Sequence, residues 1–167
     1  MRSYRAEDAE TIVVALGSVL GTIEDTVDEL REEGVSIGAL AIKSFRPFPL
    51  EEVRAALGHA KRVVVLEKAL AVGIGGIVSA NVRMALSGIQ LHGYTVIAGL
   101  GGRPITKKSL RKLFTEAVAD ELQPLTFLDM NWEVVQRELE RQVAGRRPGP
   151  HAENIIRDIG TVAAGSH

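Results

Sequence analysis

The chain has 167 residues, which fits one domain with an extension, and its 46% hydrophobic and 25% charged residues are ordinary for a soluble globular protein. A net charge of −1 argues against electrostatic binding of nucleic acid. The absence of cysteine excludes disulfides, thiolate catalysis and cysteine-ligated iron–sulfur clusters within this chain.

The first ten residues are polar, and we expect them to form a lead-in to the fold. They lack the apolar core of a signal peptide. No later apolar run approaches the roughly 20 residues that a membrane helix needs. The sequence therefore predicts a cytoplasmic protein that does not insert into a membrane.

A strand and a helix are predicted next. Thr11–Leu16 is a continuous apolar run, as in a strand that is buried on both faces. Gly17 ends this strand, and Ser18 is a suitable N-cap for a helix. From Val19 the apolar residues follow helical spacing and acidic residues cover the other face, until Gly34 ends the helix.

The same alternation continues through the middle of the chain. Val35–Ile42 is predicted to be a second strand, and the prolines in Lys43–Pro49 prevent its continuation. A short helix follows at Leu50–Leu57, with two glutamates in its first turn, where they suit the helix dipole. The third strand, Arg62–Leu66, leads through a glycine turn into a helix at Ile77–Leu86.

The fourth strand–helix pair completes the predicted domain. Tyr94–Ala98 is predicted to be a strand that ends in a second glycine loop, Gly99–Gly102, and Thr106 is expected to cap the next helix. Strands that alternate with helices in this way predict a three-layer α/β/α sandwich around a mostly parallel sheet. The pattern does not give the strand order, and it leaves an antiparallel edge strand open.

The tail of the chain departs from this alternation. We predict an α/β domain over residues 1–122 and a C-terminal extension over residues 123–167. Asn131 is a candidate cap for one last helix, Gly145–Pro150 is a predicted linker, and Asn154–Ile159 a short helical turn. Because the extension has few apolar residues, we expect it to lie on the domain or on a partner.

The turn after the third strand is a candidate ligand site. Its glycines, Gly73, Gly75 and Gly76, precede a helix start, where backbone N–H groups can hold an anion. Their spacing matches neither GxGxxG nor GxxxxGK[ST], so we interpret the turn mainly as a strand-to-helix reversal. Glu67 ends the buried strand where α/β proteins often place functional groups, although such a carboxylate more often orients a loop.

Basic residues crowd the second glycine loop, and no acidic residue follows until Glu116. Two lysines fall in the first turn of a helix, where the dipole disfavours each cation by about 0.3–1 kcal/mol. Two interpretations stay open: exposed lysines without a role, or a contact with an anion or an acidic partner. The candidate contact residues are Gly101, Gly102, Arg103, Lys107 and Lys108.

The sequence contains no catalytic or metal-binding motif that we recognise. Its four histidines are scattered without HxH or HExxH spacing, and no GxSxG motif is present. The aromatic residues are too dispersed for a base-stacking platform. We therefore predict no catalytic, cofactor-binding or metal-binding residue in this chain.

Four stretches resemble one family in their order and spacing: TIVVALGSV (Thr11–Val19), FRPFP (Phe45–Pro49), VVVLEK with the later glycines (Val63–Gly76) and IAGLGGRPIT (Ile97–Thr106). They are similar to the C-terminal domain of the α subunit of pyruvate and other 2-oxoacid:ferredoxin oxidoreductases. That domain resembles the transketolase C-terminal domain. The tail motifs DMNWEVVQREL and PGPHAENIIRDIG also resemble the final segments of such α subunits.

The resemblance implies a part in a larger enzyme. Such enzymes oxidatively decarboxylate a 2-oxoacid with thiamine diphosphate, pass electrons through iron–sulfur clusters to ferredoxin or flavodoxin, and form an acyl-CoA. The family's cofactors and main catalytic residues lie on other domains or subunits. The resemblance thus implies a structural and assembly domain, without a cofactor of its own, whose partners are the other subunits. The alternative is a stand-alone α/β module that binds a phosphorylated ligand or an acidic partner at a glycine-rich turn.

Overall fold

The computed structural model describes residues 1–145, which belong to two compact units, Met1–Asp129 and a unit that starts at Met130. The first unit contains the sheet and four α-helices, and the second contributes helix α5 (Trp132–Gly145). Of the predicted linker, only Gly145 lies within the described residues, where it ends α5. The helical turn predicted at Asn154–Ile159 lies outside the described residues.

The sheet has six strands in the order β1-β3-β2-β4-β5-β6. All neighbouring strands run parallel except β1 and β3, which are antiparallel. The predicted mostly parallel sheet is therefore confirmed. The strand bounds are β1 (Arg2–Tyr4), β2 (Thr11–Ala15), β3 (Ile37–Ala41), β4 (Arg62–Glu67), β5 (His92–Ile97) and β6 (Leu125–Phe127).

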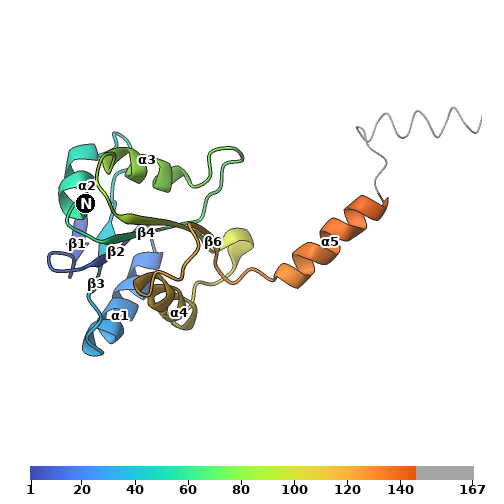
Figure 1. Cartoon of the computed structure of the whole chain (residues 1–167), viewed down its shortest axis with the longest axis horizontal. Coiled ribbons are helices and arrows are strands. Elements are labelled where there is room, and N and C mark those ends of the chain that lie inside the picture. Colours follow the sequence, from blue (N-terminus) through green and yellow to red (C-terminus); the bar gives the residue numbers. More distant parts are fainter. Residues whose placement is uncertain (146–167) are drawn as a thin grey trace, which may run out of the picture. The chain divides into compact units, whose positions relative to one another are not determined.

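Helices cover both faces of the sheet, as the predicted three-layer sandwich requires (Figure 1). One apolar core lies between the sheet and helices α1 (Val19–Glu32) and α4 (Lys107–Val118). A second core lies under helices α2 (Leu50–Leu57) and α3 (Ile77–Ala85) on the other face. None of the helices in the described part of the chain combines the length and the apolarity that crossing a bilayer requires.

Strand β1 corrects the prediction that the first ten residues are only a lead-in. It pairs with β3 at the edge of the sheet, and its side chains are largely exposed, so the sequence shows no apolar run. Contacts with α1 hold the strand end in place: the hydroxyl of Tyr4 donates to Asp28 at 2.8 Å, and Arg5 pairs with the same carboxylate. Gly38 of β3 makes room for this segment, because a Cβ there would lie 2.3 Å from the carbonyl oxygen of Arg5.

Strand β6 was also missed, because it has only three residues and follows a proline. It extends the parallel sheet beyond β5. The N–H of Thr95 donates to the carbonyl of Pro124 at 2.8 Å, and the N–H of Leu128 donates to Ile97 at 2.9 Å. The sheet thus continues past residue 122, and the domain limit drawn there remains a prediction about which segment folds alone.

The helix caps agree with the sequence at two of three positions. The side chain of Thr106 accepts a hydrogen bond from the N–H of Ser109 at 3.1 Å, which confirms the predicted cap of α4. Asn131 caps α5 in the same way, through the N–H of Val134 at 3.1 Å. The prediction for Ser18 is wrong, because its backbone is already helical and its side chain forms no capping hydrogen bond.

Helix α3 connects β4 to its neighbour β5, and α4 connects β5 to the next strand, β6, so both connections advance in the same direction across the sheet. The two helices nevertheless lie on opposite faces. The connections β4–α3–β5 and β5–α4–β6 therefore have opposite hands. Because such crossovers are right-handed in nearly all proteins, α4 would be expected beside α3. It packs beside α1 instead, which leaves the α3 face of β5 and β6 partly open.

Candidate functional site

The carboxyl ends of β2 and β4 meet at the topological switch point of the sheet. From β2 the chain continues to β3 on one side, and from β4 it continues to β5 on the other. In open α/β sheets, ligands bind outside the carboxyl ends of the strands at such a point. A crevice of about 300 Å³ lies there, lined mainly by apolar residues that include Leu16, Val19 and Ile77, together with Glu67 and Lys68.

Glu67 is the buried carboxylate of this crevice, with 5% of its surface exposed. One carboxylate oxygen accepts from the N–H of Val78 at 2.8 Å, and the other accepts from the N–H and the hydroxyl of Ser79 at 3.0 and 2.6 Å. Because these N–H groups open α3, the carboxylate occupies the place where a helix N-terminus would hold an anion. Glu67 therefore orients the glycine turn, in agreement with a strand-to-helix reversal.

The glycines of this turn serve two different purposes. Gly73 and Gly75 have φ values of +84° and +86°, a conformation that glycine adopts most easily. Gly76 has an ordinary extended backbone, but a Cβ at this position would lie 2.0 Å from Oε1 of Glu67 and 2.8 Å from the hydroxyl oxygen of Ser79. Glycine is needed at position 76 because the carboxylate takes up the space of a side chain.

The second glycine loop follows β5, at the same end of the sheet as the first, where the carboxyl ends of the parallel strands lie. Gly101 and Gly102 have φ values of +67° and +78°, so their conformation also favours glycine. The guanidinium of Arg103 donates to the backbone carbonyl of Asp129 at 3.0 Å, which ties the loop to the segment after β6.

The lysines after this loop have partners that the sequence did not reveal. Lys107 forms an ion pair with Glu29 of α1 at 2.5 Å, and Arg111 bonds Glu33 at 2.5 Å. Glu29 raises the pKa of Lys107, and its charge offsets the unfavourable position of this lysine in the first turn of α4. Lys108 is exposed and has no ion-pair partner among the described residues. An anion or partner contact at these residues stays a prediction.

A charged cluster centred on Asp120 lies at the opposite end of the sheet, where β4 and β5 begin. The carboxylate of Asp120 accepts two hydrogen bonds from Arg62, at 2.8 and 2.5 Å, and one from the hydroxyl of Tyr94 at 2.9 Å. Nδ1 of His92 lies 2.6 Å from the same carboxylate. Arg62 and His92, with Tyr94, hold the pKa of Asp120 well below its ordinary value. The cluster fastens the end of α4 to the starts of β4 and β5.

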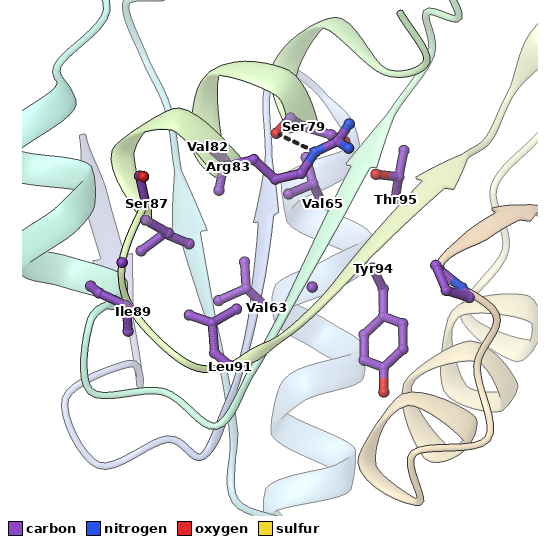
Figure 2. Close-up of a pocket in the computed structure, with 14 residues that line it drawn as sticks. Val63, Val65, Ser79, Val82, Arg83, Ser87, Ile89, Leu91, Tyr94 and Thr95 are labelled. Atoms are coloured by element: carbon purple, nitrogen blue, oxygen red, sulfur yellow. Dashed lines mark hydrogen bonds between the residues drawn. The ribbon is translucent and has the colours of Figure 1, made fainter.

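A groove of about 410 Å³ lies beside α3, on the face of the sheet opposite to α4. Figure 2 shows its walls: Val82 and Arg83 of α3 stand beside Val63 and Val65 of β4, and Thr95 lies on β5. The guanidinium of Arg83 turns back towards the carbonyl of Ser79, at 3.4 Å. The groove offers apolar contact area and one cation, as a surface for packing would.

Among the described residues, the carboxylates with the most hydrogen bonds have structural partners. Among residues 1–145, no three histidine, aspartate or glutamate side chains gather as a metal site requires. Glu67 and Asp120, the carboxylates with the most hydrogen bonds, are engaged in a helix cap and an ion-pair cluster. That this chain carries no catalytic residue stays a prediction.

Comparison with known proteins identifies the family. The family model of the pyruvate:ferredoxin oxidoreductase core domain II matches residues 9–110 of this chain. The chain belongs to this family. The resemblance seen in the sequence motifs is thereby confirmed.

Curated relatives support the same family. The chain is 43% identical over 121 residues to the pyruvate synthase subunit PorA of Thermotoga maritima, an alignment that covers 71% of this chain and 31% of the relative. It is 39% identical over 113 residues to the PorA subunit of Methanothermobacter thermautotrophicus, covering 68% and 29%. The matched segment thus spans less than a third of each of these relatives.

Two solved structures share the fold. One is the 2-oxoglutarate:ferredoxin oxidoreductase of Magnetococcus marinus with 2-oxoglutarate, coenzyme A and succinyl-CoA bound; it is 26% identical, with a TM-score of 0.55 over 66% of this chain and 18% of that one. The other is a split-gene transketolase in an inactive tetramer, 18% identical, with a TM-score of 0.53 over 72% and 42%. The second likeness concerns the fold alone and agrees with the transketolase-like architecture that we predicted.

One surface near the glycine turn was not foreseen from the sequence. Val72 and Ile74 are 99% and 66% exposed, and Leu70 and Ile77 are also exposed. The sequence does show that the turn contains four large aliphatic residues. A turn that only reverses the chain requires glycine but does not require such residues. Such residues in a solvent-facing loop point to a contact with another molecule.

Proposed function

We propose that this chain is a structural and assembly domain of a thiamine-diphosphate-dependent 2-oxoacid:ferredoxin oxidoreductase. The complete enzyme converts a 2-oxoacid such as pyruvate and CoA to acyl-CoA and CO2, and it passes electrons to ferredoxin or flavodoxin. The proposal is carried by the match of residues 9–110 to core domain II. Identity of 34–43% with pyruvate synthase subunits supports pyruvate as the first substrate to test.

The composition of this chain and the glycine turn before α3 do not fit the cofactors of such an enzyme. Iron–sulfur clusters are held mainly by cysteine thiolates, and the chain has no cysteine. A diphosphate would bind at a helix N-terminus after a glycine turn, but at α3 that place is filled by Glu67. We therefore expect the cofactors on other domains or subunits, and we assign no catalytic step to this chain.

The open surfaces of the first unit support an assembly role. The groove beside α3 leaves part of the sheet available for packing, and the loop after β4 exposes large aliphatic side chains. Apolar surface of this kind is stabilised by burial at roughly 25 cal/mol per Å². A domain that packs against other parts of an oxidoreductase accounts for both features.

Purification of the chain with its partners from the native cell tests the proposal. We expect it to copurify with polypeptides that carry thiamine diphosphate and iron–sulfur clusters, and the complex to reduce ferredoxin with a 2-oxoacid and CoA. The isolated chain should show no such activity. Steady thiamine-dependent oxidation of a 2-oxoacid by the isolated chain, or copurification without any oxidoreductase polypeptide, would overturn the proposal.

A stand-alone binding module is the second candidate. The observation in its favour is that Arg103 and Lys108 have no carboxylate within ion-pair distance among the described residues. Calorimetric titration with coenzyme A and nucleotides at low salt tests it, with Arg103→Ala as the variant and Lys112→Ala as the control. Saturable binding that only the Arg103 variant loses would favour the module, whereas no binding would favour the assembly domain.

A further inference from the structure

Residues 69–77, which comprise most of the loop between β4 and α3 and the first residue of α3, form an apolar arm on the surface of the first unit. Figure 1 shows it extending away from the sheet beside α3. Four of its side chains are large, aliphatic and exposed, and Val72 at the tip is almost fully in water. The exposed apolar residues of this arm are Leu70, Val72, Ile74 and Ile77. Several large apolar side chains exposed on one short segment point to an interaction surface.

The backbone of the arm is folded before any partner is present. Ala71 and Gly75 exchange two hydrogen bonds of 2.8 Å, and the N–H of Ile74 donates to Ala71 at 3.0 Å. These bonds close a tight turn that carries Val72 and Ile74 on either side of Gly73. Because the turn is already ordered, little conformational entropy remains to be lost on binding.

The base of the arm is positively charged. Lys68 and Arg103 follow the neighbouring strands β4 and β5, and the side chain of Lys68 lies over the Gly99 turn, 3.2 Å from where a Cβ would be. Within the described part of the chain, neither of these cations forms an ion pair with a carboxylate. Unpaired charges of one sign around an apolar surface favour a partner of the opposite sign.

We propose that the apolar arm inserts into an apolar pocket bordered by carboxylates on another polypeptide of the oxidoreductase assembly. This inference rests on the proposed function. Aliphatic side chains at the tip select an apolar pocket, and the cations at the base select its acidic rim.

Three variants test this contact in the complex purified from the native cell. Val72→Asp should reduce the recovered oxidoreductase polypeptides about tenfold or more, because it places a carboxylate in an apolar pocket beside other carboxylates. Lys68→Glu should reduce recovery at low salt. The effect should be smaller at high salt, because the Debye length, over which exposed charges interact, falls to about 3 Å at 1 M. Met84→Asp is the matched control: Met84 is also an exposed apolar residue, but it lies on α3 away from the arm.

Photo-crosslinking identifies the occupant. A photoreactive residue at position 72 should crosslink to an oxidoreductase polypeptide, at a segment where mass spectrometry finds aspartate or glutamate beside apolar residues. The same residue at position 84 should give no such product. Equal recovery with the Val72 and Met84 variants, or crosslinks from position 72 to a second copy of this chain, would overturn the inference and leave the proposed function standing. Failure of the unaltered chain to bring down any oxidoreductase polypeptide would overturn the proposed function itself.

Thermal unfolding followed by circular dichroism separates binding from folding. Because Val72 is almost fully exposed, Val72→Asp should unfold within a few degrees of the unaltered chain. Val72→Lys distinguishes an apolar pocket from a purely acidic surface. Loss of recovery with this variant supports the apolar pocket, and improved recovery would refute it.

Discussion

Gly76→Ala tests the contact that shapes the switch point. The backbone at Gly76, with φ −72° and ψ 136°, is one that alanine adopts without strain. The new methyl group would instead lie 2.0 Å from Oε1 of Glu67 and 2.7 Å from its Cδ. Glu67 is buried, so its carboxylate has little space into which it can move while it remains bonded to α3.

The size of the effect follows from the bonds that would be lost. Glu67 accepts three hydrogen bonds, two from N–H groups at the start of α3 and one from a hydroxyl. Hydrogen bonds to a charged group contribute about 1.5–3 kcal/mol each, and water does not readily replace the bonds that a displaced buried carboxylate loses. We expect the free energy of unfolding to fall by about 3–5 kcal/mol, a large part of the roughly 5–15 kcal/mol that stabilises a domain.

Urea unfolding followed by circular dichroism measures this loss. Gly21→Ala is the matched control, because Gly21 lies within α1 and a Cβ added to it would meet no atom within 4 Å. Alanine there should raise the free energy of unfolding by about 0.5–1 kcal/mol through its better helix propensity. If Gly76→Ala stays within about 0.5 kcal/mol of the unaltered chain, the carboxylate contact does not stabilise the turn and the reasoning is refuted.

Three further predictions concern the rest of the first unit. Because the folded-state pKa of Asp120 is lowered, its stabilisation is present above the ordinary carboxyl pKa of about 4 and is lost as the pH falls below it. Asp120→Asn should therefore reduce the loss of urea resistance under acid conditions; an unchanged pH dependence would contradict this. Thr106→Ala should cost about 1 kcal/mol in urea unfolding, whereas Ser18→Ala should cost less than about 0.5 kcal/mol because its side chain does not cap α1. A chain that ends at Asp129 should unfold like the full chain, and one that ends at Leu122 should be less stable by about 1–3 kcal/mol because it lacks β6. Equal stability of the two truncated chains would instead support residues 1–122 as the complete domain.

The main strands and helices could be predicted from the local spacing of apolar residues. The apolar run at Thr11–Leu16 became β2, and the helix predicted over Leu50–Leu57 was found at those residues. Long buried strands and amphipathic helices can be recognised in a sequence because burial imposes a fixed spacing on apolar residues. Strands β1 and β6 have three residues each and no apolar run, so only their neighbours β3 and β5 define them.

The surroundings of the candidate site were harder to foresee. The sequence around Lys107 shows no nearby negative charge, because its partner, Glu29, is on a helix 78 positions earlier in the chain. Arg62 and Asp120 meet although 58 positions separate them. Ion pairs of this range depend on which helices share a face, and that in turn depends on the unusual side taken by α4.

By itself, the sequence determined the class of fold, the family and the absence of a thiolate chemistry, because these follow from periodicity, motif order and composition. The tertiary structure decided what the glycine turn does. Only the packing of β4 against α3 brings Glu67 to the helix N-terminus, and this fills the place that the turn alone would have left for an anion. The same packing leaves Val72 and Ile74 in water, since the turn must leave the sheet before it can return as α3. The apolar residues of the turn are visible in the sequence, but their exposure is a property of the whole fold.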